Sequence, residues 1–320
     1  MALGLLAAPR FVRAQAPAVR RIGVLLPSAM NVETYMPAFR KRLGERGWVE
    51  GKNLALEVRH VDNRYERAPG LAAELVRLKA ELLLTVSTPL SRAAKDVAGT
   101  TPIVFAWVAD PVGAGLVSSL ARPSGNATGF SNVAIGIAPK LLELLKTLVP
   151  NLERVAALDD PKFSGSSGAG DAWYAQLAEA APRVGVTLIR VDASSAAEVE
   201  QAFAAAAGKR AQAMVIPPLA HYGEQREAIA RLGKQYRIAT ASQFRGLVAA
   251  GGLVSYGSDY NEGFLRTVEY VDRILRGARP ADLPVQQVDR FELYINRKTA
   301  AELGLSIPQD VLVRANEVYE

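Results

Sequence analysis

The chain has 320 residues, no cysteine and a formal net charge of +6. With 49% hydrophobic residues it is long enough for two ordinary domains, each with a core of its own. The absence of cysteine excludes disulfides, thiolate nucleophiles and zinc ribbons. The basic residues are scattered over the polar faces of helical patterns, which favours a solvated surface over a nucleic-acid interface.

The first residues, 1–16, carry an apolar stretch that ends in Ala14–Ala16, a small-x-small pattern of the kind that precedes signal cleavage. A proline and two arginines interrupt the stretch, so it is too short to span a bilayer. The basic segment that opens a secretory signal is missing. We interpret 1–16 as the remnant of an export signal, with an ordinary flexible terminus as the alternative. The mature protein would then begin near Pro17, in a periplasm.

Short apolar runs alternate with amphipathic patterns, as expected for a mostly parallel sheet covered by helices. In the first half the apolar runs predict strands at 21–27, 54–60, 82–86 and 103–107. The amphipathic patterns predict a helix through Phe39 and Leu43 that ends at Gly47, and another over 72–78.

A stretch rich in turn formers at 122–130 ends this first series, and we expect two lobes joined near 125–131. The series then restarts, with helices expected at 138–148, 173–184 and 196–207 and strands at 155–158, 186–191 and 213–216. The predicted fold class is therefore α/β, with two doubly wound α/β lobes and a ligand cleft between them.

The predicted strands share one feature, which is a small polar or aromatic cluster directly after the strand. These clusters occupy 87–91, 107–111, 159–164, 217–222 and 256–260. In an open parallel sheet, ligands bind beyond the carboxyl ends of the strands, where such clusters gather. The pattern therefore predicts a small-molecule site assembled from many loops.

Several motifs in a fixed order make the chain similar to a known family. They are the segments 47–53 (GWVEGKN), 109–117 (ADPVGAGLV), 122–129 (RPSGNATG), 249–257 (AAGGLVSYG) and 291–300 (FELYINRKTA). From near Arg21 to Glu320 the chain resembles the solute-binding proteins of ABC importers in the tryptophan/tyrosine-type family. The resemblance implies a type I periplasmic-binding fold whose lobes close on a ligand, which for some members is an aromatic amino acid.

The resemblance also implies that the chain crosses between the lobes three times. The expected first lobe is 17–128 plus 256–285, and the second is 129–255 plus 286–320. We expect a monomer that hands a small-molecule ligand to an ABC permease in the inner membrane. Two departures from the family pattern stand out: the arginine-rich opening is missing, and 163–170 stands where an Asn-Pro-rich loop is usual. The second departure leaves the identity of the ligand open.

Polar residues at the strand ends are candidates for holding the charged groups of a ligand. Ser87 and Thr88 lie where a strand turns into a helix, so they could receive a carboxylate or simply cap the helix. Asp110 and Asp259 follow buried runs and could pair with an ammonium group. For Asp110 an Asp-Pro turn is the structural alternative.

The remaining candidates are Ser28, in the loop after the first strand, and a set of aromatic residues at or beside strand ends. Aromatic walls bury much apolar ligand surface at little conformational cost, although each of these side chains could equally belong to the core. The aromatic candidates are Tyr35, Trp107, Phe163, Tyr222 and Phe244.

The sequence offers little for catalysis. The histidines are His60 and His221, which lack metal-site spacing, and neither a Gly-x-Ser-x-Gly elbow nor a phosphate-binding loop occurs. We therefore expect no enzyme, no metal and no cofactor, but a periplasmic solute-binding component of an ABC importer. It would trap a small carboxylated, aromatic amino-acid-like ligand by hinge closure. The alternatives are an enzyme that uses the same interlobe cleft and a ligand-sensing module.

Overall fold

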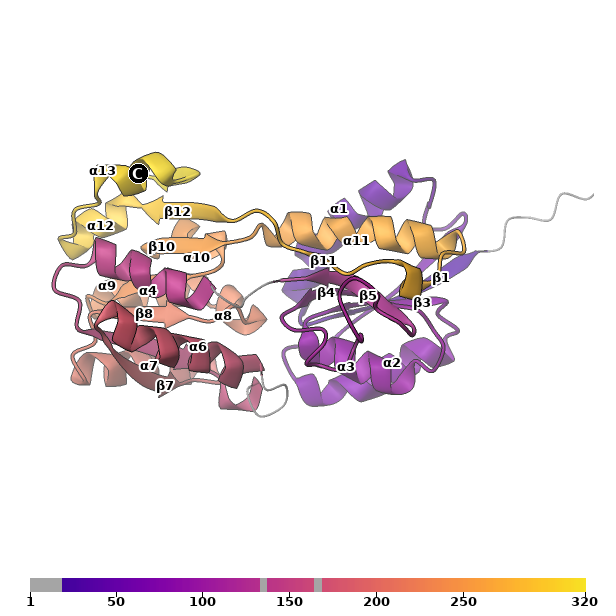
Figure 1. Ribbon diagram of the computed structural model, residues 1–320, viewed down its shortest axis with the longest axis horizontal. Helices are drawn as coiled ribbons and strands as arrows, with labels where there is room; N and C mark the ends of the chain where they lie inside the picture. Colours follow the sequence, from indigo (N-terminus) through magenta and orange to yellow (C-terminus); the bar gives the residue numbers. More distant parts are fainter. Residues whose placement is uncertain (1–18, 133–136, 164–168) are drawn as a thin grey trace, which may run out of the picture.

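The computed structural model describes residues 19–132, 137–163 and 169–320. They form two α/β lobes side by side along the long axis, each with helices on both faces of a mostly parallel sheet (Figure 1). The predicted fold class is confirmed. The expected export signal, 1–16, lies outside the described residues, and so does most of the loop at 163–170.

The first lobe is built on a sheet in which every neighbouring pair of strands is parallel. Its strand order is β11-β5-β4-β3-β1-β2. The strands are β1 (Arg20–Leu26), β2 (Leu54–His60), β3 (Leu82–Val86), β4 (Ile103–Val108), β5 (Ala127–Ser131) and β11 (Gln286–Gln287). Its helices are α1 (Ala29–Glu45), η1 (Tyr65–Arg67), α2 (Ala68–Arg77), α3 (Thr88–Val97), α11 (Tyr260–Leu275) and η2 (Pro280–Asp282).

The second lobe has the strand order β13-β12-β10-β9-β8-β6-β7, and only the β10–β12 pair is antiparallel among the pairs in the described residues. The strands are β6 (Arg154–Asp159), β7 (Thr187–Asp192), β8 (Ala213–Ile216), β9 (Ala239–Ser242), β10 (Val254–Gly257), β12 (Glu292–Asn296) and β13 (Glu317–Tyr319). The helices are α4 (Ile137–Leu148), α6 (Ala169–Val184), α7 (Ala196–Gly208), α8 (Ala220–Glu224), α9 (Arg226–Gln235), α10 (Arg245–Ala249), α12 (Arg297–Leu303) and α13 (Gln309–Arg314).

The two sheets share one winding. In each lobe the second strand lies outside the first, and the third, fourth and fifth follow on the other side, as β2-β1-β3-β4-β5 and as β7-β6-β8-β9-β10. This order reverses direction between the first and third strands, so loops leave the sheet to opposite faces there and open a crevice. The crevice of one lobe lies at β1 and β3, and that of the other at β6 and β8.

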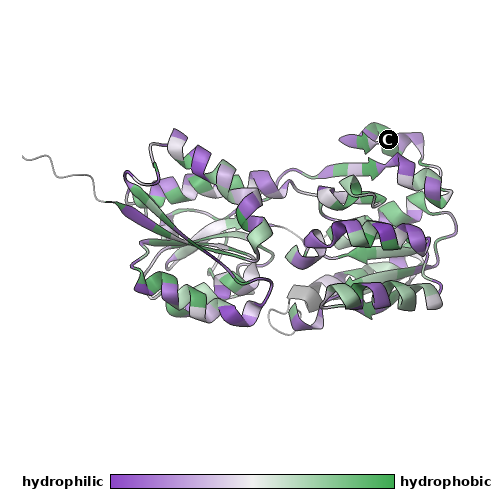
Figure 2. Ribbon diagram, turned by 180° about the vertical axis from the view of Figure 1, so that it is seen from behind, coloured by the Kyte–Doolittle hydropathy of each residue, from purple (hydrophilic) through white to green (hydrophobic). Residues whose placement is uncertain are grey.

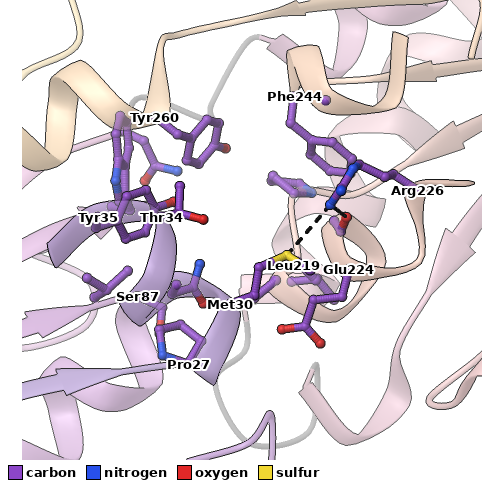
Figure 3. Close-up of a pocket in the computed structure, with 18 of the residues that line it drawn as sticks. Pro27, Met30, Thr34, Tyr35, Ser87, Leu219, Glu224, Arg226, Phe244 and Tyr260 are labelled. Carbon is purple, nitrogen blue, oxygen red and sulfur yellow. Dashed lines mark hydrogen bonds between the residues drawn. The ribbon is translucent and has the colours of Figure 1, made fainter. Parts of the chain in front are cut away.

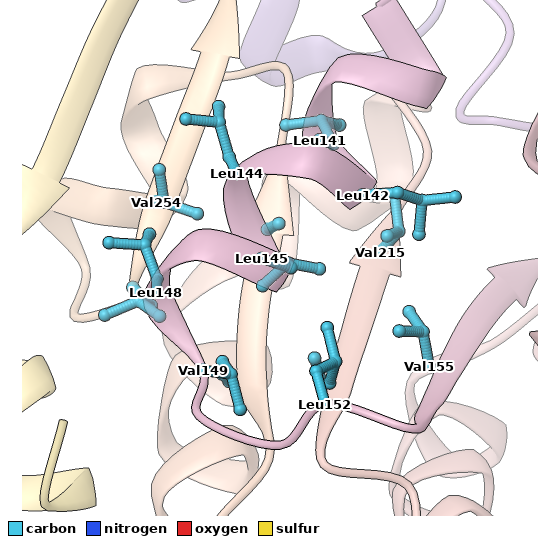
Figure 4. Close-up of a cluster of buried hydrophobic side chains, with 14 of the residues drawn as sticks. Leu141, Leu142, Leu144, Leu145, Leu148, Val149, Leu152, Val155, Val215 and Val254 are labelled. Carbon is cyan, nitrogen blue, oxygen red and sulfur yellow. The ribbon is translucent and has the colours of Figure 1, made fainter. Parts of the chain in front are cut away.

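The cores sit on both faces of each sheet, as the fully apolar strands require. In the first lobe α1 and α11 cover one face, with Phe39 and Phe264 buried, while α2 and α3 cover the other, with Leu75 and Leu90. In the second lobe α4 and α6 cover one face and α7 and α9 the other. Figure 2 shows the apolar sides of these helices turned to the sheets. Figure 4 shows the leucine-rich side of α4 lying over β8 and β10.

The chain passes between the lobes after Ser131, between Gly257 and Tyr260, and between Gln287 and Glu292. The first sheet thus continues to Ser131, beyond the expected lobe end at 128. The strand β5 was missed because its sequence is rich in turn formers. Its Gly129 has φ 152°, and a Cβ there would lie 2.0 Å from the carbonyl oxygen of Phe105, so close pairing with β4 requires glycine.

Shortening a core leucine should destabilise the second lobe. Leu145 is a fully buried residue of α4, so Leu145→Ala should lower the free energy of unfolding by about 2–5 kcal/mol because it leaves a cavity. The matched control is Val313→Ala, at a side chain that is 74% exposed, with an expected change within about 0.5 kcal/mol. Urea denaturation followed by circular dichroism measures both, and equal losses in the two variants would contradict this account of the core.

Candidate functional site

A cavity of about 560 Å³ lies between the lobes, at the crevices of both sheets. Its size falls in the range of sites for small organic ligands. Figure 3 shows its two walls, with Tyr35, Ser87 and Tyr260 from the first lobe facing Glu224 and Phe244 from the second. Aromatic side chains line both walls: Tyr35, Tyr65, Trp107 and Tyr260 on one side and Phe163 and Phe244 on the other.

Two residues with unusual backbone conformations form the base of the first-lobe wall. Ser87 has φ 82° and Trp107 has φ 59°, in the left-handed region that non-glycine residues rarely occupy. They follow or end the neighbouring strands β3 and β4, and the β4–β5 register shifts between Ala106 and Val108, at Trp107. Such bulges and strained residues cluster at binding sites, because they re-aim side chains at the end of a strand.

The indole of Trp107 is held in place by packing. Its ring lies 4.4 Å from the ring of Tyr260 and 5.5 Å from that of Phe130. A Cβ at position 263 would lie 2.1 Å from the indole, so Gly263 on α11 leaves the space that this ring fills. Beside it, Tyr35 stacks on Phe264 with ring centroids 4.8 Å apart. Aromatic rings held by packing thus make up much of the first-lobe wall.

Burial keeps the phenols of this wall neutral. Burial raises the pKa of Tyr35 to about 12, and it raises the pKa of Tyr260 as well. A neutral phenol offers one hydrogen-bond donor and one acceptor and carries no charge. These tyrosines can thus pack against an aromatic ligand without repelling a ligand carboxylate.

Direct contacts already cross between the lobes at the edges of this cavity. The Nδ2 of Asn63 donates to the Oε2 of Glu224 at 2.9 Å, and the hydroxyl of Tyr260 donates to the Oε1 of Gln243 at 3.4 Å. The edge of Tyr65 packs on Phe163, with ring centroids 5.4 Å apart. The structure therefore has its lobes in contact around the cavity.

Four residues that line the cavity each have a buried polar atom without a hydrogen-bond partner in the described residues. Buried side-chain atoms usually find a hydrogen-bond partner, so exceptions mark places where a ligand or water would bind. Across the described ranges, the cavity-lining atoms that are buried and unpartnered are Ser87 Oγ, Trp107 Nε1, Asn132 Oδ1 and Glu224 Oε1. They comprise a hydroxyl, one donor and two acceptors, which suits a ligand that carries both kinds of group.

The expected site residues divide into two groups. Half of them line the cavity: Tyr35, Ser87, Trp107, Phe163 and Phe244. The other half lie outside its lining and have structural partners: Ser28, Thr88, Asp110, Tyr222 and Asp259.

Of the second group, three are held within their own lobe. Ser28 caps α1 by accepting from the N–H of Asn31, and Thr88 Oγ1 accepts from the N–H of Ala109. The ring of Tyr222 is fully buried, and its hydroxyl donates to the carbonyl of Ala193 at 2.6 Å.

The two expected partners of an ammonium group are occupied by backbone N–H groups. Asp110 Oδ1 accepts from the N–H of Gly113 at 2.8 Å, as in the Asp-Pro turn that was the alternative. Asp259 caps α11, and its Oδ1 accepts from the N–H groups of Asn261 and Glu262 at 2.8 and 3.1 Å. Asp259 lies at a neighbouring surface cavity instead.

Sequence reasoning missed several residues that line the cavity, among them Tyr65, Asn132, Glu224, Arg226 and Tyr260. Tyr260 belongs to the strand-end cluster 256–260, so that signal could have found it. Glu224 and Arg226 lie farther along, at the end of α8 and the start of α9, and carry no strand-end signal. Tyr65 begins the short helix η1 after β2.

A second interlobe cavity, of about 690 Å³, lies behind the Tyr65–Phe163 pair. His221 lines it and is buried, with Nε2 3.5 Å from Oδ2 of Asp160. Burial lowers the pKa of His221, while the carboxylates of Asp160 and Glu224 act in the opposite direction. His221 is therefore neutral in the folded protein near neutral pH.

In the described part of the chain, no helix is both long and apolar enough to span a membrane. In the same residues, no group of three or more His, Cys, Asp or Glu side chains is arranged to hold a metal ion.

Comparison with known proteins places this architecture. Residues 28–319 match the family described as ABC transporter substrate binding protein. The chain is 27% identical over 267 residues to a tyrosine-binding protein of Clostridioides difficile strain R20291, covering 83% of this chain and 75% of the relative. The fold resembles type I periplasmic-binding-like solute-binding proteins.

Many solved structures are similar in fold, including one with L-Trp bound and one that is ligand-free. The ABC domain from Streptococcus pneumonia in complex with L-Trp superposes with a TM-score of 0.84 at 24% identity, covering 94% of this chain and 100% of that one. The ligand-free, open structure of an adhesive substrate binding protein from Clostridium difficile superposes with a TM-score of 0.66 at 24% identity, covering 94% and 99%.

Removing the cap of α11 should cost stability. Asp259→Ala deletes the acceptor of two N–H groups, so the free energy of unfolding should fall by about 0.5–2 kcal/mol. Asp289→Ala, at an exposed side chain paired with Arg266, serves as control and should change it by less than about 0.5 kcal/mol. Urea titrations of both variants test this. Parental stability with lost L-tryptophan binding in Asp259→Ala would instead favour the ammonium role.

The buried His221 should make the protein less stable in acid. Because its native pKa lies below the ordinary value of about 6.5, the unfolded chain binds the proton more readily, and stability falls as the pH drops through that value. His221→Gln should reduce the drop in Tm between about pH 7.5 and pH 5.5. His60→Gln, which keeps His221, is the control. Equal drops in the parent and in His221→Gln would contradict the assignment.

Proposed function

We propose, on the premise that this chain belongs to the family of ABC transporter substrate binding proteins, that it serves an ABC importer. It traps a small carboxylated, aromatic amino-acid-like ligand between its lobes and presents it to a permease in the inner membrane. It works in the periplasm as a monomer, and its role requires no bond to be made or broken.

The observation that carries the ligand class is the aromatic lining of both cavity walls. A ring inserted between Trp107 and Tyr35 on one side and Phe244 on the other would bury apolar surface on both faces. The unpartnered hydroxyl of Ser87 lies at the start of α3, where the first N–H groups of the helix lack intrahelical partners. A carboxylate placed there gains hydrogen bonds and the favourable end of the helix dipole.

Binding by hinge closure is supported by the way the lobes meet. The cavity takes its walls from both lobes, so a ligand reaches its full set of contacts only when they are close together. The TM-score is higher against the L-Trp complex than against the open, ligand-free structure, which favours a closed arrangement of the lobes here. The contacts Asn63–Glu224 and Tyr65–Phe163 add to closure from the protein side.

Small-angle X-ray scattering and thermal denaturation together test this proposal. L-tryptophan and L-tyrosine are added to the protein, and the radius of gyration and Tm are followed as their concentration rises. We expect the protein to become more compact and the free energy of unfolding to rise by about 2.7 kcal/mol at a hundredfold excess over Kd, because the ligand binds only the folded state.

A negative result in that experiment would contradict either the ligand class or the closure mechanism, and the two can be told apart. If neither amino acid raises the Tm, the proposed ligand class is wrong. If one binds without any change in the radius of gyration, closure by that ligand is wrong while binding stands. Glycine, which has the same charged groups and no ring, is the control and should bind much more weakly than either aromatic amino acid.

A further inference from the structure

Glu224 lines the ligand cavity, and its carboxylate is hydrogen-bonded to a residue of the other lobe. It ends α8 of the second lobe, and its Oε2 accepts from the Nδ2 of Asn63 in the first lobe at 2.9 Å. Its Oε1 is buried and has no hydrogen-bond partner among the described residues, and Glu224 is one of the residues that line the cavity. No ion pair with an arginine, lysine or histidine is formed by Glu224 in those residues.

A buried carboxylate oxygen of this kind destabilises the folded protein unless a cation or a hydrogen-bond donor contacts it. An ionised group that loses its water without gaining a partner is strongly unfavourable, and its ordinary partner is a positive charge. The nearby guanidinium of Arg226 does not supply it, because that group pairs with Glu227 at 2.9 Å and donates to the carbonyl of Gly223. The missing partner therefore has to come from the cavity.

Asn63 fixes the position of the Glu224 carboxylate by a hydrogen bond, and the backbone of Asn63 itself has an unusual conformation. Asn63 has φ 57°, in the left-handed region where asparagine is tolerated, and its N–H donates to the carbonyl of Pro27 at 2.8 Å. The side chain thus extends from the end of β1 and β2 toward the second lobe. Its hydrogen bond uses Oε2 of Glu224 and leaves Oε1 without a partner in the described residues.

We infer that Glu224 is the receptor for the ammonium group of the ligand and that Asn63 is its positioning residue. The inference rests on the proposed function and names the atom that recognises the positive end of the ligand. Because Asn63 and Glu224 belong to different lobes, their hydrogen bond exists only when the lobes are together. Ammonium binding and lobe closure therefore favour one another.

The other carboxylates near the cleft lack these properties. Asp259 and Asp110 accept from backbone N–H groups and lie outside the cavity lining. Asp160 accepts from Ser194 Oγ and the N–H of Lys162. Glu33 lines the cavity, but its side chain is exposed, so solvent screens its charge.

The test compares two probes that differ only in the amino group, L-tryptophan and indole-3-propionate, by isothermal titration calorimetry. The parent should bind L-tryptophan at least about tenfold more tightly. In Glu224→Gln this preference should disappear, while the affinity for indole-3-propionate changes by less than about twofold. Glu66→Gln, at an exposed carboxylate outside this cavity, is the control and should keep the parental preference.

The outcomes separate the inference from the proposed function. If the parent binds L-tryptophan and Glu224→Gln retains the preference, the inference is overturned and the function stands. The inference is also overturned if Glu33→Gln, and not Glu224→Gln, removes the preference. If the parent binds neither L-tryptophan nor L-tyrosine, the proposed function falls and the inference with it. The Tm of each empty variant shows that it is folded.

The role of Asn63 is tested by a double-mutant cycle. Asn63→Gly keeps a residue that tolerates the left-handed backbone and removes the side chain. We expect it to reduce the preference for L-tryptophan partly, by about threefold, and to have no further effect in the background of Glu224→Gln. An equal effect in both backgrounds would show that Asn63 does not act through Glu224.

Discussion

The site depends on one constraint: the parallel strands of both lobes point their carboxyl ends at the same cleft. The first five strands of the two sheets also follow the same order. At β1 and β3 of the first sheet and at β6 and β8 of the second, neighbouring connections leave to opposite faces. The chain must turn sharply where β3 meets α3, and Ser87 takes φ 82° there. The surrounding packing maintains this conformation, since all residues of β3 and β4 and the first turn of α3 are buried.

The two walls that this arrangement produces differ in construction. The first-lobe wall rests on long elements, with Tyr35 on α1 and Tyr260 on α11, and α1 and α11 pack together on the sheet. The second-lobe wall comes from short helices, with Glu224 ending α8 and Phe244 preceding α10. Aromatic packing dominates the first wall, and the second adds Glu224 and Arg226 to its own aromatic rings. A ligand that has both a ring and charged groups therefore needs both lobes to satisfy it.

Much of the fold followed from periodicity in the sequence, while the site followed only in part. Buried parallel strands are continuous apolar runs, which is why 54–60, 82–86 and 213–216 coincide with β2, β3 and β8. The strand β5 was missed because Gly129 reads as a turn, although the close approach of Phe105 is what requires it. Strand-end position located Ser87 and Trp107. It could not locate Glu224, whose exposure to the cavity depends on how the lobes are placed.

The acidic residues show why a polar side chain at a strand end does not by itself indicate a ligand site. A side chain that follows a strand and precedes a helix is well placed both to cap the helix and to bind a ligand. Asp259 uses Oδ1 to cap α11, and its side chain is exposed outside the lining of the ligand cavity. Glu224 has one oxygen committed to Asn63 and the other to nothing within the described structure. The distinction lies in which hydrogen bonds the fold satisfies internally, and only the three-dimensional arrangement of both lobes reveals it.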